Sequence, residues 1–299
     1  MSSPETTPMK SRNGENCGVI LTNRGGDDPL SLNRDEIISL FKKHGALVFR
    51  GFGFDGMEKM VLFTERFGKK FATHPSIYRG KVNEDDTVQT VDFGSDAIPL
   101  HSEMAFLPAA LRPEMAFFYC VKTTGDGGHT LLCDGTKVPP LLSAELRQWL
   151  ESNRLKYKLV YPAAIWQRFF RTTSRDELNA LLKRYKADDC LTLKEDNAIY
   201  LERVADGLTK PKFSRKKAFA NMMVFYYVRA VPLVTLENGE PIPKSINEEL
   251  LGITDDLSAE VDWHVDDLLM FDNTRMMHGR RAFGDDERVI YTRFCATAF

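Results

Sequence analysis

The first regular pattern of apolar and polar positions in the chain is helical. Asn33, with Glu36 three residues later, is typical of a capping box, and apolar residues follow at helical spacing from Ile37 to Phe41. Gly45 is a typical helix stop. The pattern therefore predicts a helix that begins after Asn33 and ends at Gly45.

Beyond this helix the dominant pattern changes to short apolar runs separated by turn residues, which favours strands. We expect strands at 46–50, 87–93, 97–101, 115–122, 130–133, 157–161, 267–272 and 289–296. Further helical spacing predicts helices at 57–67, 144–150 and 174–185.

No internal repeat or low-complexity linker divides these elements. We therefore predict a single domain from 15 to 299, mainly β with flanking helices (an α+β chain). The mixed segment 138–262 interrupts the β core as a partly helical insertion. Residues 1–14 are polar and rich in Ser, Thr and Pro, and are expected to be a disordered lead.

Composition narrows the classes of function. With 40 basic and 42 acidic residues, the net charge of −2 does not favour a partner made of nucleic acid or a membrane surface. The five cysteines are scattered and form no CxxC pair, and the longest apolar runs are too short to span a bilayer. We expect a cytoplasmic protein.

Two His-x-acid motifs compete as the start of a metal site. In an extended strand the first and third residues project to the same face, so His101 and Glu103 can converge on one cation. His264 and Asp266 form the same motif and are the rival pair. A site with two His and one carboxylate needs another His from a distant strand and leaves coordination positions open.

His278 fits that requirement, because it follows the strand predicted at 267–272. The polar turn after that strand is expected to put His278 at the strand's end. Arg293 lies 15 residues later, in the last predicted strand, and offers a two-pronged cation to a dicarboxylate. Arg288 is a rival anchor, but regular strand geometry directs the two arginines to opposite faces. Spacing from His278 favours Arg293.

These motifs stand in an order that resembles the taurine dioxygenase / 2,4-D dioxygenase family of Fe(II)/2-oxoglutarate enzymes. The chain looks most similar to the branch found in antibiotic and natural-product biosynthesis. The similarity rests on four stretches, at 45–52, 98–106, 127–135 and 263–293.

The resemblance implies a double-stranded β-helix (jelly-roll) core that uses Fe(II), 2-oxoglutarate and O2. By position in the motifs, His101, Glu103 and His278 would be the metal ligands. Arg293 and Thr130 would bind the distal carboxylate of 2-oxoglutarate. The rival pair His264 and Asp266 would be structural.

For the substrate, His74 resembles the position at which taurine dioxygenase uses a histidine. Within the insertion, Trp166, Asn221 and Phe225 are candidates for the pocket or its lid.

The implied activity is oxidation, in the first place hydroxylation, of a small amino-acid-like metabolite, free or tethered to a carrier protein. Succinate and CO2 would be released. Desaturation, epoxidation or oxidative ring formation with the same cofactors is the alternative outcome. A non-catalytic cupin-like binding protein is a further alternative of a different class, although it would not need an anchor for 2-oxoglutarate.

Overall fold

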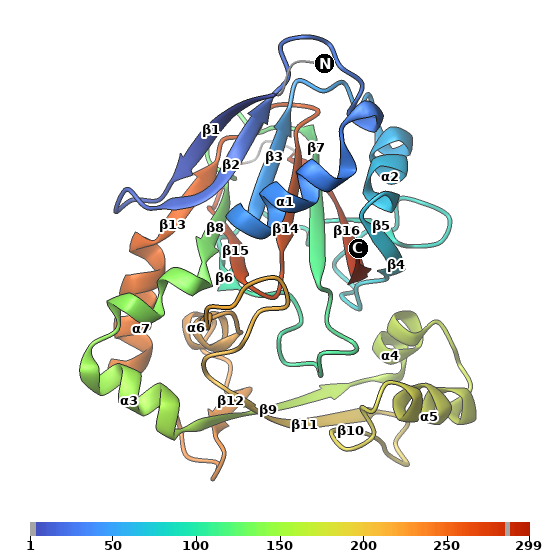
Figure 1. Cartoon of the computed structure of the whole chain (residues 1–299). Coiled ribbons are helices and arrows are strands. Elements are labelled where there is room, and N and C mark those ends of the chain that lie inside the picture. The colour runs from blue at the N-terminus through green and yellow to red at the C-terminus, as the bar shows by residue number, and fades with distance from the viewer. Residues whose placement is uncertain (1–3, 285–287) are drawn as a thin grey trace.

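The structure, a computed structural model, describes residues 4–284 and 288–299. Its larger sheet has the strand order β1-β2-β3-β14-β7-β16-β4, and β5 pairs with residues 291–293 of β16 (Figure 1). In chain order these strands are β1 (Glu5–Lys10), β2 (Asn16–Thr22), β3 (Ala46–Arg50), β4 (Gly68–Ala72), β5 (Val88–Thr90), β7 (Met115–Lys122), β14 (Leu268–Asp272) and β16 (Val289–Ala298).

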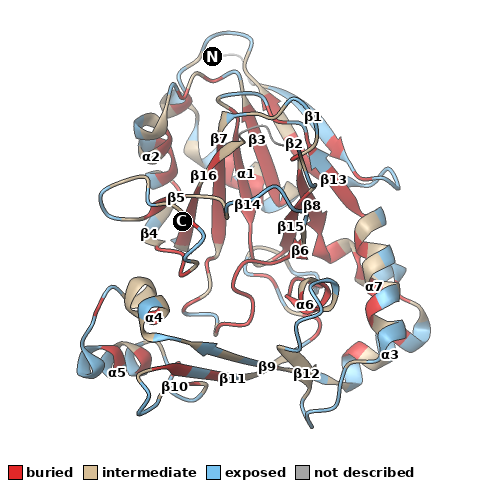
Figure 2. Cartoon of the chain, turned by 180° about the vertical axis from the view of Figure 1, so that it is seen from behind, coloured by how far each residue is buried: buried red, intermediate tan, exposed pale blue. Residues whose placement is uncertain are grey.

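A second sheet of four strands, in the order β13-β8-β15-β6, faces the first. Its strands are β6 (Ile98–His101), β8 (Thr130–Asp134), β13 (Ser258–Val261) and β15 (Met276–Arg280). A cluster of buried apolar side chains from both sheets, among them Val48, Phe118 and Leu132, fills the space between them. Buried residues dominate the central strands of both sheets, whereas β1 and β4, at the edges of the large sheet, are mostly exposed or half-buried (Figure 2).

Helices α1 (Arg34–His44) and α2 (Met57–Glu65) pack against the other face of the large sheet. Alternate residues of β3 serve the two faces: Leu47 and Phe49 meet the helices, while Ala46 and Val48 point between the sheets. A strand that is covered on both faces needs apolar residues at every position, which explains why Ala46–Phe49 is a continuous apolar run. Both faces of this sheet are therefore part of the core.

The segment between β8 and β13 forms a separate layer, visible below the two sheets in Figure 1. It contains a four-stranded sheet in the order β10-β11-β9-β12. Its strands are β9 (Arg154–Tyr161), β10 (Leu191–Leu193), β11 (Ile199–Asp206) and β12 (Val234–Leu236). Its helices are α3 (Ala144–Ser152), α4 (Ala163–Phe170), α5 (Arg175–Arg184), α6 (Met223–Val228) and α7 (Lys244–Asp256).

The structure is mainly β with flanking helices, as predicted, and several predicted elements lie where expected. The Asn33 side chain caps α1 by accepting from the backbone N–H groups of Asp35 and Glu36, and Gly45 ends the helix with φ of 78°. The strands at 46–50 and 115–122 have the predicted bounds. The predicted insertion contains the separate layer, and the chain rejoins the small sheet at Ser258.

The expectation of a disordered lead at 1–14 is wrong for its described part. Residues 5–10 form β1, which pairs antiparallel with β2, and only 1–3 lie outside the described residues. Backbone pairing orders this polar strand, whose side chains are mostly exposed. The composition of the segment therefore does not predict a strand.

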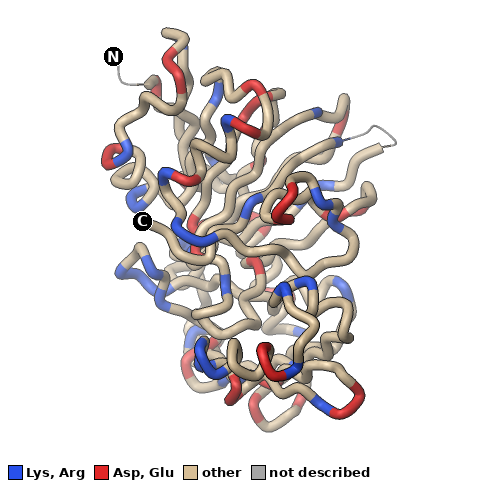
Figure 3. Tube along the Cα trace, turned by 90° about the vertical axis from the view of Figure 1, so that its right-hand side faces the viewer, with Lys and Arg blue, Asp and Glu red and all other residues tan. Residues whose placement is uncertain are grey.

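Basic and acidic residues are interspersed along the chain, as its small net charge requires (Figure 3). Within 4–284 and 288–299, no helix is both long enough and apolar enough to cross a membrane.

Strand β15 approaches β6 so closely that Gly279 has no room for a side chain. A Cβ atom at Gly279 would lie 2.6 Å from the carbonyl oxygen of Ile98 and 3.2 Å from the backbone nitrogen of Leu100. The register shifts at this point, with His278 opposite His101 and Arg280 opposite Ile98. The absence of a side chain at Gly279 therefore permits the pairing of the two strands.

We predict that Gly279→Ala lowers the free energy of unfolding by ~1–3 kcal/mol, because the new methyl group forces the two backbones apart. Urea denaturation followed by circular dichroism measures the effect. Gly252→Ala is the matched control, since that position in α7 is open and alanine favours a helix. Equal urea midpoints for Gly279→Ala and the wild type would contradict the close approach.

Candidate functional site

The site begins with two histidines from neighbouring strands. His101 is the last residue of β6 and pairs across the sheet with His278 in the middle of β15. Directly opposed residues of an antiparallel pair place their side chains on the same face, and the two imidazole centroids lie 4.3 Å apart. His278 is thus buried within a strand, whereas the sequence predicted it at the end of the preceding strand.

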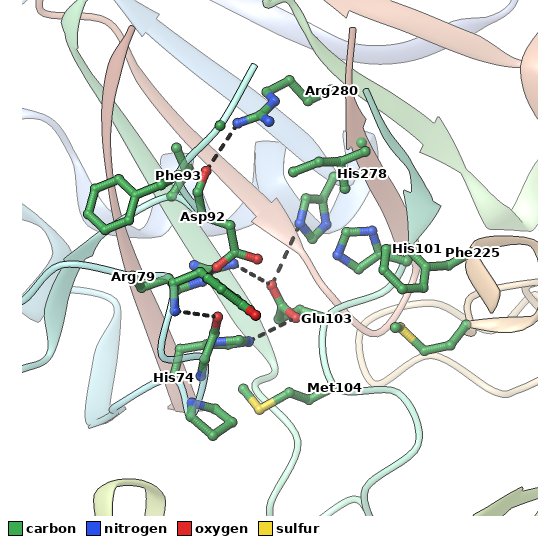
Figure 4. A pocket seen from close by; sticks show the side chains of 18 of the residues that line it. His74, Arg79, Asp92, Phe93, His101, Glu103, Met104, Phe225, His278 and Arg280 are labelled. Atoms are coloured by element: carbon green, nitrogen blue, oxygen red, sulfur yellow. Dashed lines mark hydrogen bonds and ion pairs between the residues drawn. The ribbon is translucent and has the colours of Figure 1, made fainter. Parts of the chain in front are cut away.

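Glu103 lies in the turn after β6 rather than in an extended strand. The fully buried side chain of Asn273 fixes the Glu103 backbone: its oxygen accepts from the Glu103 N–H at 2.7 Å, and its amide donates to the Glu103 carbonyl at 2.9 Å. These bonds direct the Glu103 carboxylate toward the two histidines (Figure 4). One ligand atom from each of His101, Glu103 and His278 lies within 4.8 Å of the other two.

Two cationic or proton-donating side chains hold the Glu103 carboxylate. His74 Nε2 lies 3.2 Å from Oε1, and Arg79 Nη2 donates to Oε2 at 3.2 Å (Figure 4). Burial favours the neutral carboxyl, but His74 and Arg79 outweigh burial and hold the pKa of Glu103 well below its usual value. Glu103 is therefore a carboxylate, the form that binds a cation.

Each histidine has a ring nitrogen that a metal could use. Pro99 O lies 2.9 Å from Nδ1 of His101, which makes Nδ1 the donor and leaves Nε2 as the possible metal-binding nitrogen. Burial and the neighbouring His101 hold the pKa of His278 well below its usual value, so His278 is neutral. Its Nδ1 is buried without a hydrogen-bond partner in the described chain, and its Nε2 lies 3.8 Å from Glu103. No described hydrogen bond uses the lone pair of His278, and this donor set fits a divalent metal ion.

The three side chains line a cavity of about 480 Å3. Arg288 and Thr130 line the same cavity, and Arg288 Nη2 donates to Thr130 Oγ1 at 3.0 Å. Trp263 Nε1 also donates to that oxygen at 3.0 Å, so the hydroxyl proton of Thr130 is free to donate. Burial lowers the pKa of Arg288 to about 10, and within the described residues no carboxylate pairs with it. A half-buried cation that faces a cavity fits an anionic ligand.

Arg293, which spacing from His278 favoured over Arg288, does not line the cavity. Arg293 donates to the Val61 carbonyl at 3.0 Å and to Glu65 at 3.1 Å, and its guanidinium lies 3.6 Å from the ring centre of Phe71. The argument that the two arginines face opposite ways holds, but the odd-numbered face of β16 packs toward α2, away from the cavity. Spacing from His278 was therefore a poor guide.

The two predicted substrate residues have different positions. His74 lines the cavity as expected, but its ring nitrogens are both engaged, since Nδ1 accepts from the Ser76 N–H at 3.1 Å and Nε2 meets Glu103. The geometry makes His74 a partner of Glu103 rather than a substrate contact. Asn221 does not line the cavity, because its side chain bonds the backbone of Gly207 and Met223. Asn221 therefore belongs to the structure around the cavity and not to its lining.

The remaining candidate residues differ in whether they line the cavity. Phe225 of α6 lines the cavity, with its ring centre 4.9 Å from that of His101, whereas Trp166 is buried in the core. His264 is exposed, and Asp266 accepts hydrogen bonds from the backbone of Phe54 and Asp55, so the rival motif is structural.

Sequence reasoning missed Arg79. It lies in the long loop between β4 and β5, and it bonds Asp92 and Thr292 as well as Glu103. His74 marks this loop in the sequence, but no motif marks Arg79 itself. The same is true of Asn273, although its place in the Asp272-Asn273-Thr274 turn after a buried strand was visible.

Comparisons with known proteins agree on one family. The sequence profile of the family described as "Taurine catabolism dioxygenase TauD, TfdA family" matches residues 11–294. Dapdiamide synthesis protein DdaC of Enterobacter agglomerans is 24% identical over 279 residues, which cover 86% of this chain and 82% of that protein.

Two solved structures share the fold. A taurine dioxygenase from Burkholderia xenovorans superposes with a TM-score of 0.66 at 16% identity, covering 98% of this chain and 89% of that one. PvcB of Pseudomonas aeruginosa is described as an Fe, alpha-ketoglutarate dependent oxygenase from an isonitrile synthetic pathway. It superposes with a TM-score of 0.64 at 17% identity, covering 98% and 91%.

Asn273 generates a prediction about cation binding. We expect Asn273→Ala to weaken Mn(II) binding by ~10- to 100-fold, because the Glu103 backbone loses the partner that orients its carboxylate. Calorimetric titration with Mn(II) measures the affinity, with the exposed Asn238→Ala as the control. Unchanged Mn(II) affinity in a folded Asn273→Ala protein would show that Glu103 is oriented by other contacts.

Proposed function

Because the chain belongs to the TauD/TfdA family of dioxygenases, we propose that His101, Glu103 and His278 bind its iron. Membership of the family confirms the expected enzyme, a dioxygenase dependent on Fe(II), 2-oxoglutarate and O2. The observation that carries the assignment is the convergence of two imidazoles and a carboxylate, all buried, on one point. Two histidines and one carboxylate are the ligand set of non-haem Fe(II) oxygenases, with positions left for co-substrates.

We further propose that Arg288 and Thr130 bind the distal carboxylate of 2-oxoglutarate. Arg288 is a half-buried cation without a described carboxylate partner, and the hydroxyl proton of Thr130, which no described hydrogen bond uses, adds a second donor. Iron bound at the three proposed ligands would supply oxidative decarboxylation of 2-oxoglutarate by O2 to succinate and CO2, in which one oxygen atom enters succinate and the other oxidises the substrate. In this proposal the two facing sheets are a double-stranded β-helix that holds both the iron ligands and the two residues that bind 2-oxoglutarate.

The substrate that we propose is a small amino-acid-like metabolite, with hydroxylation as the reaction. Side chains of both charges line the cavity near its mouth. Arg229 donates only a long hydrogen bond, 3.4 Å, to the Ala97 carbonyl, and Asp96 is exposed. A zwitterionic amino-acid group is complementary to this pair.

The rim also supports presentation of the substrate by a carrier protein. Tyr78 and Phe93 both line the cavity and are 66% and 68% exposed. Large apolar side chains exposed beside a pocket are typical of a contact surface for another molecule. The natural-product setting proposed here agrees with the name of the DdaC relative and with the isonitrile pathway of PvcB.

The activity is tested by incubating the enzyme with Fe(II), 2-oxoglutarate and O2, using amino acids and their carrier thioesters as substrates. We expect succinate release that depends on one of these substrates and is lost in His278→Ala. Mass spectrometry distinguishes hydroxylation, which adds one oxygen atom, from desaturation or ring formation, which removes two hydrogen atoms. Succinate release that persists in His278→Ala would refute the assignment of the metal ligand.

The 2-oxoglutarate anchor is tested separately. We predict that Arg288→Leu raises the Kd of 2-oxoglutarate by ~10- to 100-fold, because a charge-assisted hydrogen bond to its carboxylate is lost. Arg288→Lys is expected to lie between wild type and Leu, since it keeps the charge without the planar fork. Titration of the Mn(II)-loaded protein with 2-oxoglutarate measures Kd, and Arg293→Lys is the matched control. Weakened binding in Arg293→Lys alone would reverse the assignment.

A further inference from the structure

The insertion contributes an apolar region to the cavity that the metal and 2-oxoglutarate proposals leave unused. We call it the apolar chamber, and it is lined by Met104, Phe106, Leu159, Tyr161, Ile165 and Met222. None of these side chains carries a charge. The ring centres of Phe106 and Tyr161 lie 6.3 Å apart. Three of the six, Leu159, Tyr161 and Ile165, come from β9 and α4 of the separate layer.

The apolar chamber adjoins the candidate metal ligands. Met104 directly follows Glu103 in sequence, and Figure 4 shows its side chain below the Glu103 carboxylate. Phe225, which lies against His101, lines the same cavity beside Met222. A group bound in the chamber would therefore lie next to the position where oxidation occurs.

One polar atom in the apolar chamber has no partner. The hydroxyl oxygen of Tyr161 is buried and makes no hydrogen bond within the described chain. Burial raises the pKa of Tyr161 well above its usual value, so the hydroxyl keeps its proton and can donate or accept. Buried polar groups in native proteins nearly always have a partner, so an unpaired one that lines a cavity indicates a ligand.

Tyr157 is a second tyrosine with an unpaired hydroxyl, but it lies outside the cavity. It lies four residues earlier on β9, on the same face of the strand, and its hydroxyl also lacks a described partner. Tyr157 is 1% exposed and does not line the cavity. A ligand that enters the cavity can reach Tyr161 but has no route to Tyr157.

We propose that the substrate carries a large aromatic group that fills the apolar chamber and ends in a hydrogen-bonding substituent, such as a phenol or an indole N–H, paired with the Tyr161 hydroxyl. This inference rests on the proposed function, because it assumes that the substrate enters the cavity that holds iron and 2-oxoglutarate. The charged amino-acid end remains at the mouth with Arg229 and Asp96. Tyr161 is then a residue that selects the substrate rather than one that takes part in the oxidation.

The test uses fragments that probe the chamber alone, so that carrier attachment does not matter. The protein is loaded with 2-oxoglutarate and with Zn(II), a diamagnetic ion that His and carboxylate ligands bind and that leaves nearby methyl signals sharp. Its 11 methionines are labelled with 13C at the methyl group, and p-cresol and toluene are titrated. We expect both fragments to shift the methyl signals of Met104 and Met222. The signal of Met9, which is buried outside the cavity, should stay in place.

Tyr161→Phe removes only the hydroxyl. We expect it to weaken p-cresol binding by ~2- to 10-fold and to leave toluene binding unchanged, because one hydrogen bond to the phenol is lost. Tyr157→Phe, the matched control, should change neither fragment. Ile165→Trp fills the chamber and should abolish both shifts.

The outcomes separate the two proposals. If Zn(II) and 2-oxoglutarate do not bind, the proposed function fails. Fragment shifts at Met104 and Met222 would then still support the apolar chamber as an aromatic-binding site, and their absence would overturn it. If both bind but toluene leaves Met104 and Met222 unshifted, the apolar chamber is not a ligand site. If both fragments bind and Tyr161→Phe weakens them equally or not at all, the hydroxyl is not the partner of the substrate.

Discussion

The pairing of β15 with β6 is the constraint on which the site depends. It sets His278 opposite His101, and the register shift at Gly279 keeps these residues opposed while Arg280 pairs with Ile98. A slip of one residue would turn one imidazole to the other face of the sheet. Glu103 then needs only the short turn after β6 and the two hydrogen bonds from Asn273 to complete the group. The positions of these three candidate metal ligands are thus set by backbone pairing more than by side-chain contacts with each other.

Around this group, charge is distributed so that Glu103 and His278 have defined protonation states. Arg79 and His74 keep Glu103 ionised despite its burial, and burial keeps His278 neutral. Arg288 is set apart from them just before β16, where among the described residues it bonds Thr130 and no acid. The site therefore presents a cation-binding group and an anion-binding group in one cavity, and a dicarboxylate keto acid needs both.

Much of this arrangement could be predicted from the sequence. The His101-Ser102-Glu103 motif and His278 were identified because motifs report residue type and order, and the α1 helix because Asn33 and Gly45 act locally. The sequence could not show that Arg288 rather than Arg293 lines the cavity, because this depends on which face of β16 meets the cavity, a tertiary property. It placed His74 at the cavity but not against Glu103, since only the folded loop brings the two side chains together. The paired strand β1 and the contact of Arg79 also depend on distant segments and leave no local signal.

The separate layer has a consequence for how such an enzyme diversifies. The candidate metal ligands, Arg288 and Thr130 all lie on or beside the strands of the two facing sheets, whereas Leu159, Tyr161 and Ile165 of the apolar chamber come from the insertion. Mutations in β9 and α4 can therefore change which substrate is oxidised without disturbing the candidate metal ligands or the residues proposed to bind 2-oxoglutarate. Selection can act on the two halves of the cavity almost independently, so a lineage built on this plan can acquire new substrates while its oxygen chemistry stays fixed.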